Sequence, residues 1–137
     1  MSGVLLDTCA LIWLANKEAV EIKALDVIAE AWEAKLPVCV SPISAWEIGM
    51  LHSKGKLPST LEPKEWLRQF IAQAKFSWVE MSWELLVTSS SLPGNINGDP
   101  ADRIIAATAR QNGYMLITRD RNLLNYAKQG YLLATKC

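Results

Sequence analysis

The sequence has few of the side chains on which many metal and redox sites depend. Its one histidine is His52, and its three cysteines, Cys9, Cys39 and Cys137, lie far apart along the chain. An odd number of widely spaced cysteines fits neither a disulfide framework nor a structural zinc site. This pattern is typical of proteins from reducing compartments. We therefore expect a cytoplasmic protein without disulfides or zinc.

Long apolar runs and an excess of charge are missing too. The chain has no stretch of about 18 apolar residues and no basic segment leading into a long apolar one, so we expect neither membrane insertion nor secretion. The 14 Lys and Arg residues balance the 14 Asp and Glu residues. With zero net charge, no general field attracts the protein to nucleic acid or membranes. A polyanionic ligand must therefore be held by a local basic patch or by a metal ion.

The length and composition indicate one domain. The chain has 137 residues, of which 50% are hydrophobic, and this is enough to bury a proper core. It contains no internal repeat or low-complexity segment. The loop-like stretches at 53–60 and 89–98 are too short to link separate domains. We therefore expect a single domain over residues 1–137.

Short apolar runs alternate with helical patterns along the chain. The runs predict strands at residues 4–6, 37–41, 76–81 and 114–118, with a further candidate at 131–133. Two apolar stripes at helical spacing lie between them, the first formed by Ile22, Leu25, Ile28, Trp32 and Leu36 and the second by Trp66, Leu67, Phe70, Ile71 and Ala74. This alternation predicts an α/β fold, a three-layer α/β/α sandwich with a central parallel sheet and right-handed crossovers.

Four acidic residues lie where strands end or helices begin: Asp7, Glu47, Asp102 and Asp120. In a parallel α/β sheet these places share the edge at which ligands bind. Carboxylates ~4 Å apart repel by several kcal/mol at an effective dielectric constant of about 20, and a divalent cation relieves that repulsion. Oxygen ligands without a nearby Cys or His cluster favour Mg²⁺ or Mn²⁺ over zinc. The sequence thus predicts a metal centre at this edge.

Each acid also has a structural alternative. Asp7 can cap the helix that follows it, and Asp120 can lie in a turn. Ser44 and Glu47 have the spacing of a capping box, in which both side chains bond to the backbone at the start of a helix. Taken singly, each residue is a weak indication of a metal site; the expected meeting of all four at one edge is what favours it.

The pair Asp99 and Pro100 predicts the start of another helix. Asp at the N-cap position followed by Pro at the first helical position is a common arrangement. It would put Asp102 in the first turn, where a carboxylate is stabilised by the helix dipole. We expect Asp99 to be a cap and not a ligand.

Basic residues near the acids are candidates for holding a polyanion. Arg103, Arg119 and Arg121 flank two of the acids, and Lys54 and Lys56 follow Glu47. The structural alternative for each is a solvated surface charge or a salt bridge to one of the acids.

Tryptophans can stack on nucleic-acid bases, and the chain has six. Trp32 and Trp66 belong to the two apolar stripes, so we expect most of the six to lie in the core. The pattern says least about whether Trp13 and Trp46 lie in the core or are free to bind bases.

Five motifs follow one another along the chain. They are Leu5-Leu6-Asp7-Thr8, the segment 40–48 that contains Ser41-Pro42-Ile43-Ser44-Ala45-Trp46-Glu47, Lys54-Gly55-Lys56-Leu57, Asp99-Pro100-Ala101-Asp102-Arg103 with the apolar residues that follow, and Leu116-Ile117-Thr118-Arg119-Asp120. Together they resemble the PIN-domain nucleases, and most of all the VapC-type toxins of toxin–antitoxin pairs. The resemblance runs from residue 4 to about residue 126 in the same order as in the family, so it is more specific than any one motif.

The resemblance implies an α/β/α sandwich and a Mg²⁺- or Mn²⁺-dependent endoribonuclease that hydrolyses RNA phosphodiester bonds. It implies a cognate antitoxin and a homodimer as assembly partners. It also assigns metal binding and catalysis to the quartet Asp7, Glu47, Asp102 and Asp120. Thr8 and Thr118 would be polar neighbours of the first and fourth acids, and together with Arg103 and Arg119 they are the candidate RNA-binding residues.

The chain departs from the family pattern in one loop. Many relatives have a bulky aromatic residue between the Pro and the second Asp, where this chain has Ala101, and often histidines just upstream, where it has residues 95–97. No metal ligand is lost, so the departure concerns substrate preference.

Two other protein classes also place acids at the strand ends of an α/β sheet. A phosphoacceptor receiver domain, which is a signalling module, needs an acidic pair after its first strand and an Asp at the end of its middle strand; here Thr8 follows Asp7, and the run 76–81 ends without an Asp. A haloacid-dehalogenase-type phosphatase needs Asp-x-Asp, whereas the chain has Asp7-Thr8-Cys9. A metal-free ribonuclease mechanism with paired histidines lacks its second histidine, and we expect His52 on the surface.

Overall fold

The computed structural model describes residues 1–57, 60, 62–96 and 98–137. Within these ranges the strands form one sheet in the order β3-β2-β1-β4-β5, and all neighbouring strands are parallel. The strands are β1 (Val4–Leu6), β2 (Val38–Val40), β3 (Ser77–Trp78), β4 (Met115–Thr118) and β5 (Leu133–Lys136). The expected parallel sheet is therefore confirmed.

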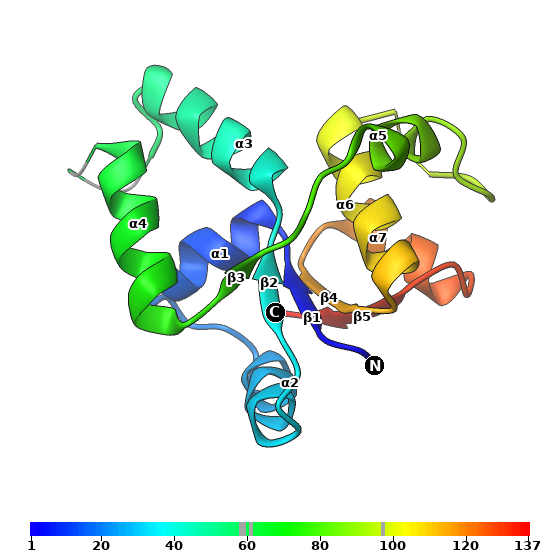
Figure 1. Cartoon of the computed structure of the whole chain (residues 1–137), viewed down its shortest axis with the longest axis horizontal. Coiled ribbons are helices and arrows are strands. Elements are labelled where there is room, and N and C mark those ends of the chain that lie inside the picture. The colour runs from blue at the N-terminus through cyan, green and yellow to red at the C-terminus, as the bar shows by residue number, and fades with distance from the viewer. Residues whose placement is uncertain (58–59, 61, 97) are drawn as a thin grey trace.

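Helices cover both faces of the sheet (Figure 1). They are α1 (Thr8–Ala15), α2 (Ile22–Glu33), α3 (Pro42–Ser53), α4 (Pro63–Ala74), α5 (Trp83–Ser89), α6 (Pro100–Asn112) and α7 (Arg121–Lys128). Side chains of α1, α2, α3 and α4 pack on one face, on which Val4, Leu6 and Val40 are buried. Those of α5, α6 and α7 pack on the other, where Leu5 and Leu116 are buried. Alternate residues of β1 thus enter different cores, as expected of a central strand in a three-layer sandwich.

The strands differ from the sequence prediction mainly at the edges of the sheet. The central strand β1 has the predicted bounds, and β2 and β4 lie within theirs. The strand predicted at 76–81 is reduced to Ser77–Trp78, and the candidate strand at 131–133 is present but shifted, because β5 runs from Leu133 to Lys136. Tyr131 lies before this strand and is stacked on Tyr126, with ring centroids 4.9 Å apart.

The two predicted apolar stripes behave differently. Trp66, Leu67 and Ile71 of α4 are buried as expected. The stripe that begins on α2 is confirmed only in part. Ile28 and Leu36 pack against the core, whereas Ile22 is 74% exposed and Trp32 is 42% exposed. The buried residues of α2 are two alanines, Ala24 and Ala31, so small side chains reach the interior where several large ones do not.

The expectation that most tryptophans lie in the core is also wrong. Trp66 alone is buried among the six, all of which lie in the described ranges, and Trp13 is partly buried. The others, Trp32, Trp46, Trp78 and Trp83, are exposed.

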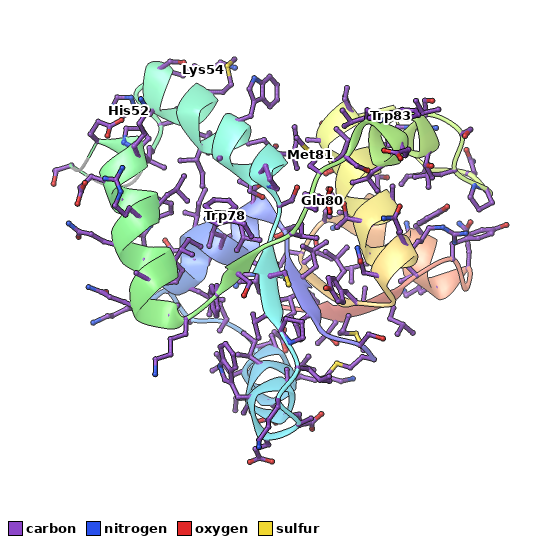
Figure 2. The ribbon with its side chains drawn as sticks, viewed as in Figure 1. His52, Lys54, Trp78, Glu80, Met81 and Trp83 are labelled. Atoms are coloured by element: carbon purple, nitrogen blue, oxygen red, sulfur yellow. The ribbon has the colours of Figure 1, made fainter. Side chains whose placement is uncertain are left out.

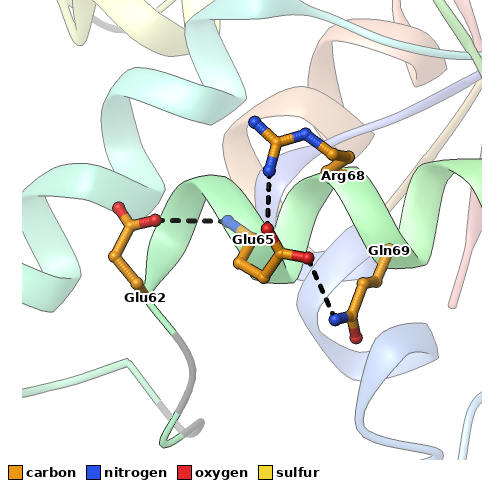
Figure 3. Close-up of polar contacts among 4 residues, drawn as sticks. All are labelled: Glu62, Glu65, Arg68 and Gln69. Atoms are coloured by element: carbon orange, nitrogen blue, oxygen red, sulfur yellow. Dashed lines mark hydrogen bonds and ion pairs between the residues drawn. The ribbon is translucent and has the colours of Figure 1, made fainter.

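The outer surface of α4 carries its own polar network (Figure 3). Glu62 caps the helix by accepting a hydrogen bond from the backbone N–H of Glu65 at 3.3 Å. Glu65 in turn accepts hydrogen bonds from Arg68 at 2.6 Å and from Gln69 at 3.1 Å. The Arg68–Glu65 pair is exposed, so it stabilises the fold by less than about 1 kcal/mol.

The strand order fixes where a ligand can bind. The chain passes from β1 to β2 and β3 on one side and then returns to place β4 and β5 on the other. The carboxyl ends of β1 and β4 therefore flank the point at which the winding direction reverses, which is where open α/β sheets bind ligands. Asp7 follows β1, and Thr118 is the last residue of β4. In the described part of the chain, no helix has the length and hydropathy needed to cross a bilayer.

Candidate active site

Asp7 lies at the centre of the site. It is 5% exposed and caps α1, because its Oδ1 accepts a hydrogen bond from the N–H of Ala10 at 2.8 Å. Its Oδ2 accepts a hydrogen bond from the hydroxyl of Thr118. Burial raises the pKa of Asp7 from 3.8 to about 6; the two hydrogen bonds oppose the rise, and the charges of Asp120 and Glu47 add to it. The ionised carboxylate is therefore under-stabilised, as expected of a cation ligand without its cation.

Thr118 joins the first and fourth acids. In addition to donating to Asp7, its Oγ1 accepts a hydrogen bond from the backbone N–H of Asp120 at 3.0 Å. The side chain of Asp120 caps α7 by accepting a hydrogen bond from the N–H of Leu123 at 2.9 Å. The side chain of Thr118 is completely buried. The threonine expected beside the fourth acid thus contacts the first acid as well.

Glu47 is hydrogen-bonded to a residue of α1. Its Oε1 accepts a hydrogen bond from the hydroxyl of Thr8 at 2.5 Å, and the same hydroxyl lies 2.8 Å from Oγ of Ser44. Thr8 has one hydroxyl proton, so if it donates that proton to Glu47, Ser44 must donate to Thr8. Burial raises the pKa of Glu47; the bond from Thr8 opposes this, and the charge of Asp99 adds to it. Thr8, expected beside Asp7, is therefore a hydrogen-bond donor to Glu47.

The capping box that was the structural alternative for Ser44 and Glu47 is not formed. The helix α3 begins earlier, with Ser41 as the N-cap and Pro42 at the first position. The hydroxyl of Ser41 accepts the N–H of Ile43 at 3.1 Å. Ser44 therefore lies inside the helix, and its side chain and that of Glu47 are available to meet Thr8.

Asp102 enters the site from α6. Asp99 caps this helix by accepting the N–H of Asp102 at 3.1 Å, and Pro100 occupies the first position, so both predictions for this helix start are confirmed. Asp102 and two of the other acids act on the same thiol, that of Cys9. Burial raises the pKa of the Cys9 thiol to about 11, and the charges of Asp7, Glu47 and Asp102 add to the rise.

Asp120 and Glu47 thus act on Asp7, and Asp102 acts with Asp7 and Glu47 on Cys9, but the four acids do not form a closed cage. No three Asp, Glu, His or Cys side chains of the described residues lie close enough to enclose a metal ion. This donor set still fits Mg²⁺ or Mn²⁺. Mg²⁺ keeps several waters and commonly uses one or two protein carboxylates together with phosphate oxygens of the substrate, so it does not require a closed cage of protein ligands.

The two arginines expected to bind a polyanion hydrogen-bond to the backbone of the protein. Arg103 donates to the carbonyl of Ser89 at 3.1 Å and of Ile96 at 3.3 Å. Arg119 donates to the carbonyls of Cys137 and, at 2.9 Å, of Ala19. Its guanidinium group lies 3.7 Å from the centre of the Trp13 ring, a cation–π contact. Both side chains therefore tie loops to the edge of the site.

Sequence reasoning missed two features of the site. One is Ser44, which resembled a helix cap and is a buried hydrogen-bond partner of Thr8. The other is an apolar groove between α1 and α3 that includes Trp46 and Met50. The spacing of Trp46, Met50 and Lys54 at four-residue intervals after Ser41-Pro42 could have indicated it, because such residues share one face of a helix.

Comparisons with known proteins agree with this geometry. The PIN domain family model matches residues 4–129. A relative from Mycobacterium tuberculosis, Ribonuclease VapC22, is 32% identical over 127 residues, which are 92% of this chain and 93% of the relative.

Solved structures share the fold. That of VapBC2 from Rickettsia felis bound to a DNA fragment from its promoter has a TM-score of 0.67 at 17% identity and covers 97% of both chains. A toxin–antitoxin complex from Klebsiella pneumoniae has a TM-score of 0.59 at 22% identity, covering 97% of this chain and 96% of that one. The receiver and phosphatase alternatives are thereby set aside, and the chain belongs to the PIN domain family.

Proposed function

We propose that the chain is a divalent-metal-dependent endoribonuclease that hydrolyses RNA phosphodiester bonds, and that it is the toxin of a toxin–antitoxin pair. The observation that carries this proposal is the buried carboxylate of Asp7 at the switch point of the sheet, with its pKa raised to about 6 and the charges of Asp120 and Glu47 acting on it. Family membership and the ribonuclease relative support the same reaction class. Both cores pack on one sheet, so we infer that residues 1–137 are a single nuclease domain.

We assign the metal to Asp7, Glu47, Asp102 and Asp120, and the same four residues to catalysis. Mg²⁺ or Mn²⁺ fits these oxygen donors. When bound, such an ion offsets charge on the phosphodiester and makes a water molecule a better nucleophile at neutral pH.

The residues of the chain prepare the site for this chemistry. Thr118 and the N–H of Ala10 fix both oxygens of Asp7, and Thr8 fixes one oxygen of Glu47. Carboxylates held in this way need little reorganisation when the reaction begins. Because Glu47 has a raised pKa and is only partly buried, it is suited to accept a proton from the attacking water.

The expected RNA-binding residues take two roles in this proposal. Thr8 and Thr118 are buried, so we assign them to positioning the acids. Arg103 and Arg119 remain partly exposed while they hold the neighbouring loops, so they can present part of their charge to the phosphates. The exposed Lys54, Lys56 and Arg121 complete the basic surface around the acids.

We propose a cognate antitoxin and a second copy of the chain as protein partners, and action on RNA in the cytoplasm. The similarity to toxin–antitoxin complexes supports an antitoxin. Exposed apolar side chains, among them Trp83, Leu86 and Val87 on one helix, offer surface of the kind that protein partners cover. A homodimer is the simplest symmetric assembly that could use such a surface.

Growth after induction tests the toxin assignment. Cells that express the wild-type chain alone should stop growing, and cells that express Asp7→Asn at a matched soluble level should grow normally. Expression of the adjacent gene together with the wild type should restore growth. Equal growth of wild type and Asp7→Asn without the neighbour would contradict the toxin assignment.

A further inference from the structure

A groove of about 330 Å³ opens between α1 and α3, directly beside Glu47. It is lined by Thr8, Cys9, Ile12, Trp46, Glu47, Met50, Leu51 and Lys54. Most of this lining is apolar, but the groove has a charged residue at each end of its α3 wall. Glu47 belongs to the acidic site, and Lys54 follows the last residue of α3. The groove is therefore continuous with the place where a phosphodiester would be cleaved.

Trp46 is the most exposed of the large apolar side chains in this lining. It is 60% exposed, and Met50, one helical turn further on, is 40% exposed. Neither residue belongs to the two hydrophobic cores of the described structure. An indole beside an acidic site, with a thioether next to it, presents a flat, polarisable surface to whatever enters the groove.

We propose that this groove binds an unpaired nucleobase of the RNA substrate, stacked on Trp46, with a neighbouring phosphate at Lys54. The inference deepens the proposed function and rests on it. A strand of RNA alternates anionic phosphates with flat rings, and the groove offers partners for both: the acidic site for the phosphate to be cleaved, an aromatic surface beside it, and an ammonium group at the far end of α3.

The length of α3 separates the two charged groups. Glu47 and Lys54 are seven residues apart, which corresponds to roughly 10 Å along a helix that rises 1.5 Å per residue. Lys54 lies at the end of α3 that points away from the sheet (Figure 2). Its charge is therefore placed to attract a phosphate outside the acidic site, and it lies too far from Glu47 along the helix to neutralise that carboxylate directly.

Stacking on Trp46 requires a base that is not paired in a duplex. Bases inside a duplex are stacked on one another and are not available to a side chain, whereas bases of single-stranded segments, loops and bulges are. Stacking on an aromatic ring tolerates any base, because every base has a π-face. Trp46 therefore contributes affinity with little base preference.

Binding without cleavage is the appropriate test. A fluorescein-labelled, unstructured RNA dodecamer is titrated with the Asp102→Asn protein in EDTA, and anisotropy gives Kd. In this background Trp46→Leu should weaken binding about 5- to 100-fold, the range expected for the loss of one stacked base. Trp46→Phe, which keeps an aromatic ring, should recover most of the affinity. Lys54→Gln should lower affinity and reduce the salt dependence by about one phosphate contact.

Trp32→Leu is the matched control. Trp32 is also an exposed tryptophan, but it lies on α2 and does not line the groove. Its replacement should leave Kd within about twofold of the parent. A duplex of the same sequence should bind the parent and Trp46→Leu equally, because its bases cannot reach the ring. Melting temperatures of all variants confirm that each is folded.

The outcomes separate this inference from the proposed function. Cleavage by Asp102→Asn in Mg²⁺ would contradict the assignment of the acids but would leave the binding result in EDTA valid. Unchanged binding of single-stranded RNA by folded Trp46→Leu would overturn the inference, as would an equal loss for duplex. If Trp46→Leu kept RNA affinity and instead lost a homodimer or an antitoxin complex, the groove would be a protein-docking site and the inference would be wrong.

Discussion

The hydroxyl of Thr118, the last residue of β4, donates a hydrogen bond to Oδ2 of Asp7, the residue that follows β1. The two residues are 111 positions apart in the sequence, and both are buried. Because β1 and β4 are neighbours with no other strand between them, this bond joins the ends of the two strands at the point where the sheet reverses its winding. It fixes the orientation of the acid whose ionisation is least favourable.

Replacing Thr118 with Val should impair both stability and cleavage. Valine has the same shape but cannot donate to Asp7 or accept from the N–H of Asp120. We expect a loss of about 1–3 kcal/mol in the free energy of unfolding, since the buried carboxylate of Asp7 and the partly buried N–H of Asp120 lose their partner, and a further rise in the pKa of Asp7. Denaturant unfolding and an RNA cleavage assay measure the two effects.

Thr118→Ser keeps the hydroxyl and should retain most of the cleavage rate. Thr108→Val is the matched control, because Thr108 is also buried but donates to the carbonyl of Ile104 within its own helix. If Thr118→Val cleaved RNA as well as Thr108→Val does, Thr118 would have no part in positioning Asp7.

Without metal, the stability of the protein should fall as pH rises from about 4 to 6. The pKa of Asp7 in the folded protein is about 6, above its ordinary value of 3.8. In this range the folded state holds more protons than the unfolded state, so the free energy of unfolding decreases with pH and stays low above pH 6. Asp7→Asn removes this effect and should be more stable by on the order of 2–3 kcal/mol at pH 7.5, with little difference near pH 4.

Urea unfolding in EDTA across this pH range measures the effect. The raised pKa of Glu47 adds a slope of the same sign to both proteins, so the difference between wild type and Asp7→Asn is the quantity to compare. A difference that does not change with pH would show that Asp7 is ionised in the folded protein without cost.

The positions of the acids could be predicted from sequence because each depends on local signals. Asp7 follows a run of apolar residues that is buried on both faces, and Asp99-Pro100 marks a helix start with high specificity. The side-chain network could not be predicted, because contacts such as Thr8 with Glu47 and Thr118 with Asp7 depend on how separate elements pack. The Ser41-Pro42 signal was stronger than the capping box at Ser44, and it decided where α3 begins.

The exposed tryptophans show a second limit of the sequence. An apolar stripe predicts that one face of a helix is covered, but it does not say by what. On α2 the two alanines are buried, whereas Trp32 is exposed and stacks on Phe76 with ring centroids 6.3 Å apart. The bounds of the edge strands β3 and β5 differ from the prediction for a related reason. An edge strand pairs with one neighbouring strand only, so its pairing constrains its bounds less.

Ser44→Ala should reduce cleavage several-fold with a modest effect on stability. The change removes the group that completes the hydrogen bonding of the Thr8 hydroxyl, so Thr8 and Glu47 become less fixed. The free energy of unfolding should fall by about 0.5–1.5 kcal/mol, as for one hydrogen bond.

Ser53→Ala is the control for Ser44→Ala, because Ser53 is exposed at the end of the same helix and donates only to the carbonyl of Met50. Equal cleavage rates for the two variants would argue against a role of Ser44 in holding Glu47.

Divalent cations should raise the melting temperature of the wild type and should not raise that of Asp7→Asn. A ligand that binds only the folded state stabilises it by mass action, and here it would also relieve the repulsion around Asp7. Thermal shift with Mg²⁺ and Mn²⁺ in parallel, with Ca²⁺ for comparison, gives the effect and ranks the ions. Equal shifts in both proteins would indicate non-specific binding.

Cleavage of a labelled RNA by purified protein tests the central claim most directly. Wild type should cleave in Mg²⁺ or Mn²⁺ and not in EDTA, and Asp102→Asn should be inactive although folded. Asp99→Asn should keep most of the activity, because Asn caps a helix about as well as Asp and Asp99 holds the N–H of Asp102 through one side-chain oxygen. Undiminished cleavage by folded Asp102→Asn, or by wild type in EDTA, would contradict the assignment of a metal-dependent nuclease site to the acids at the ends of the strands.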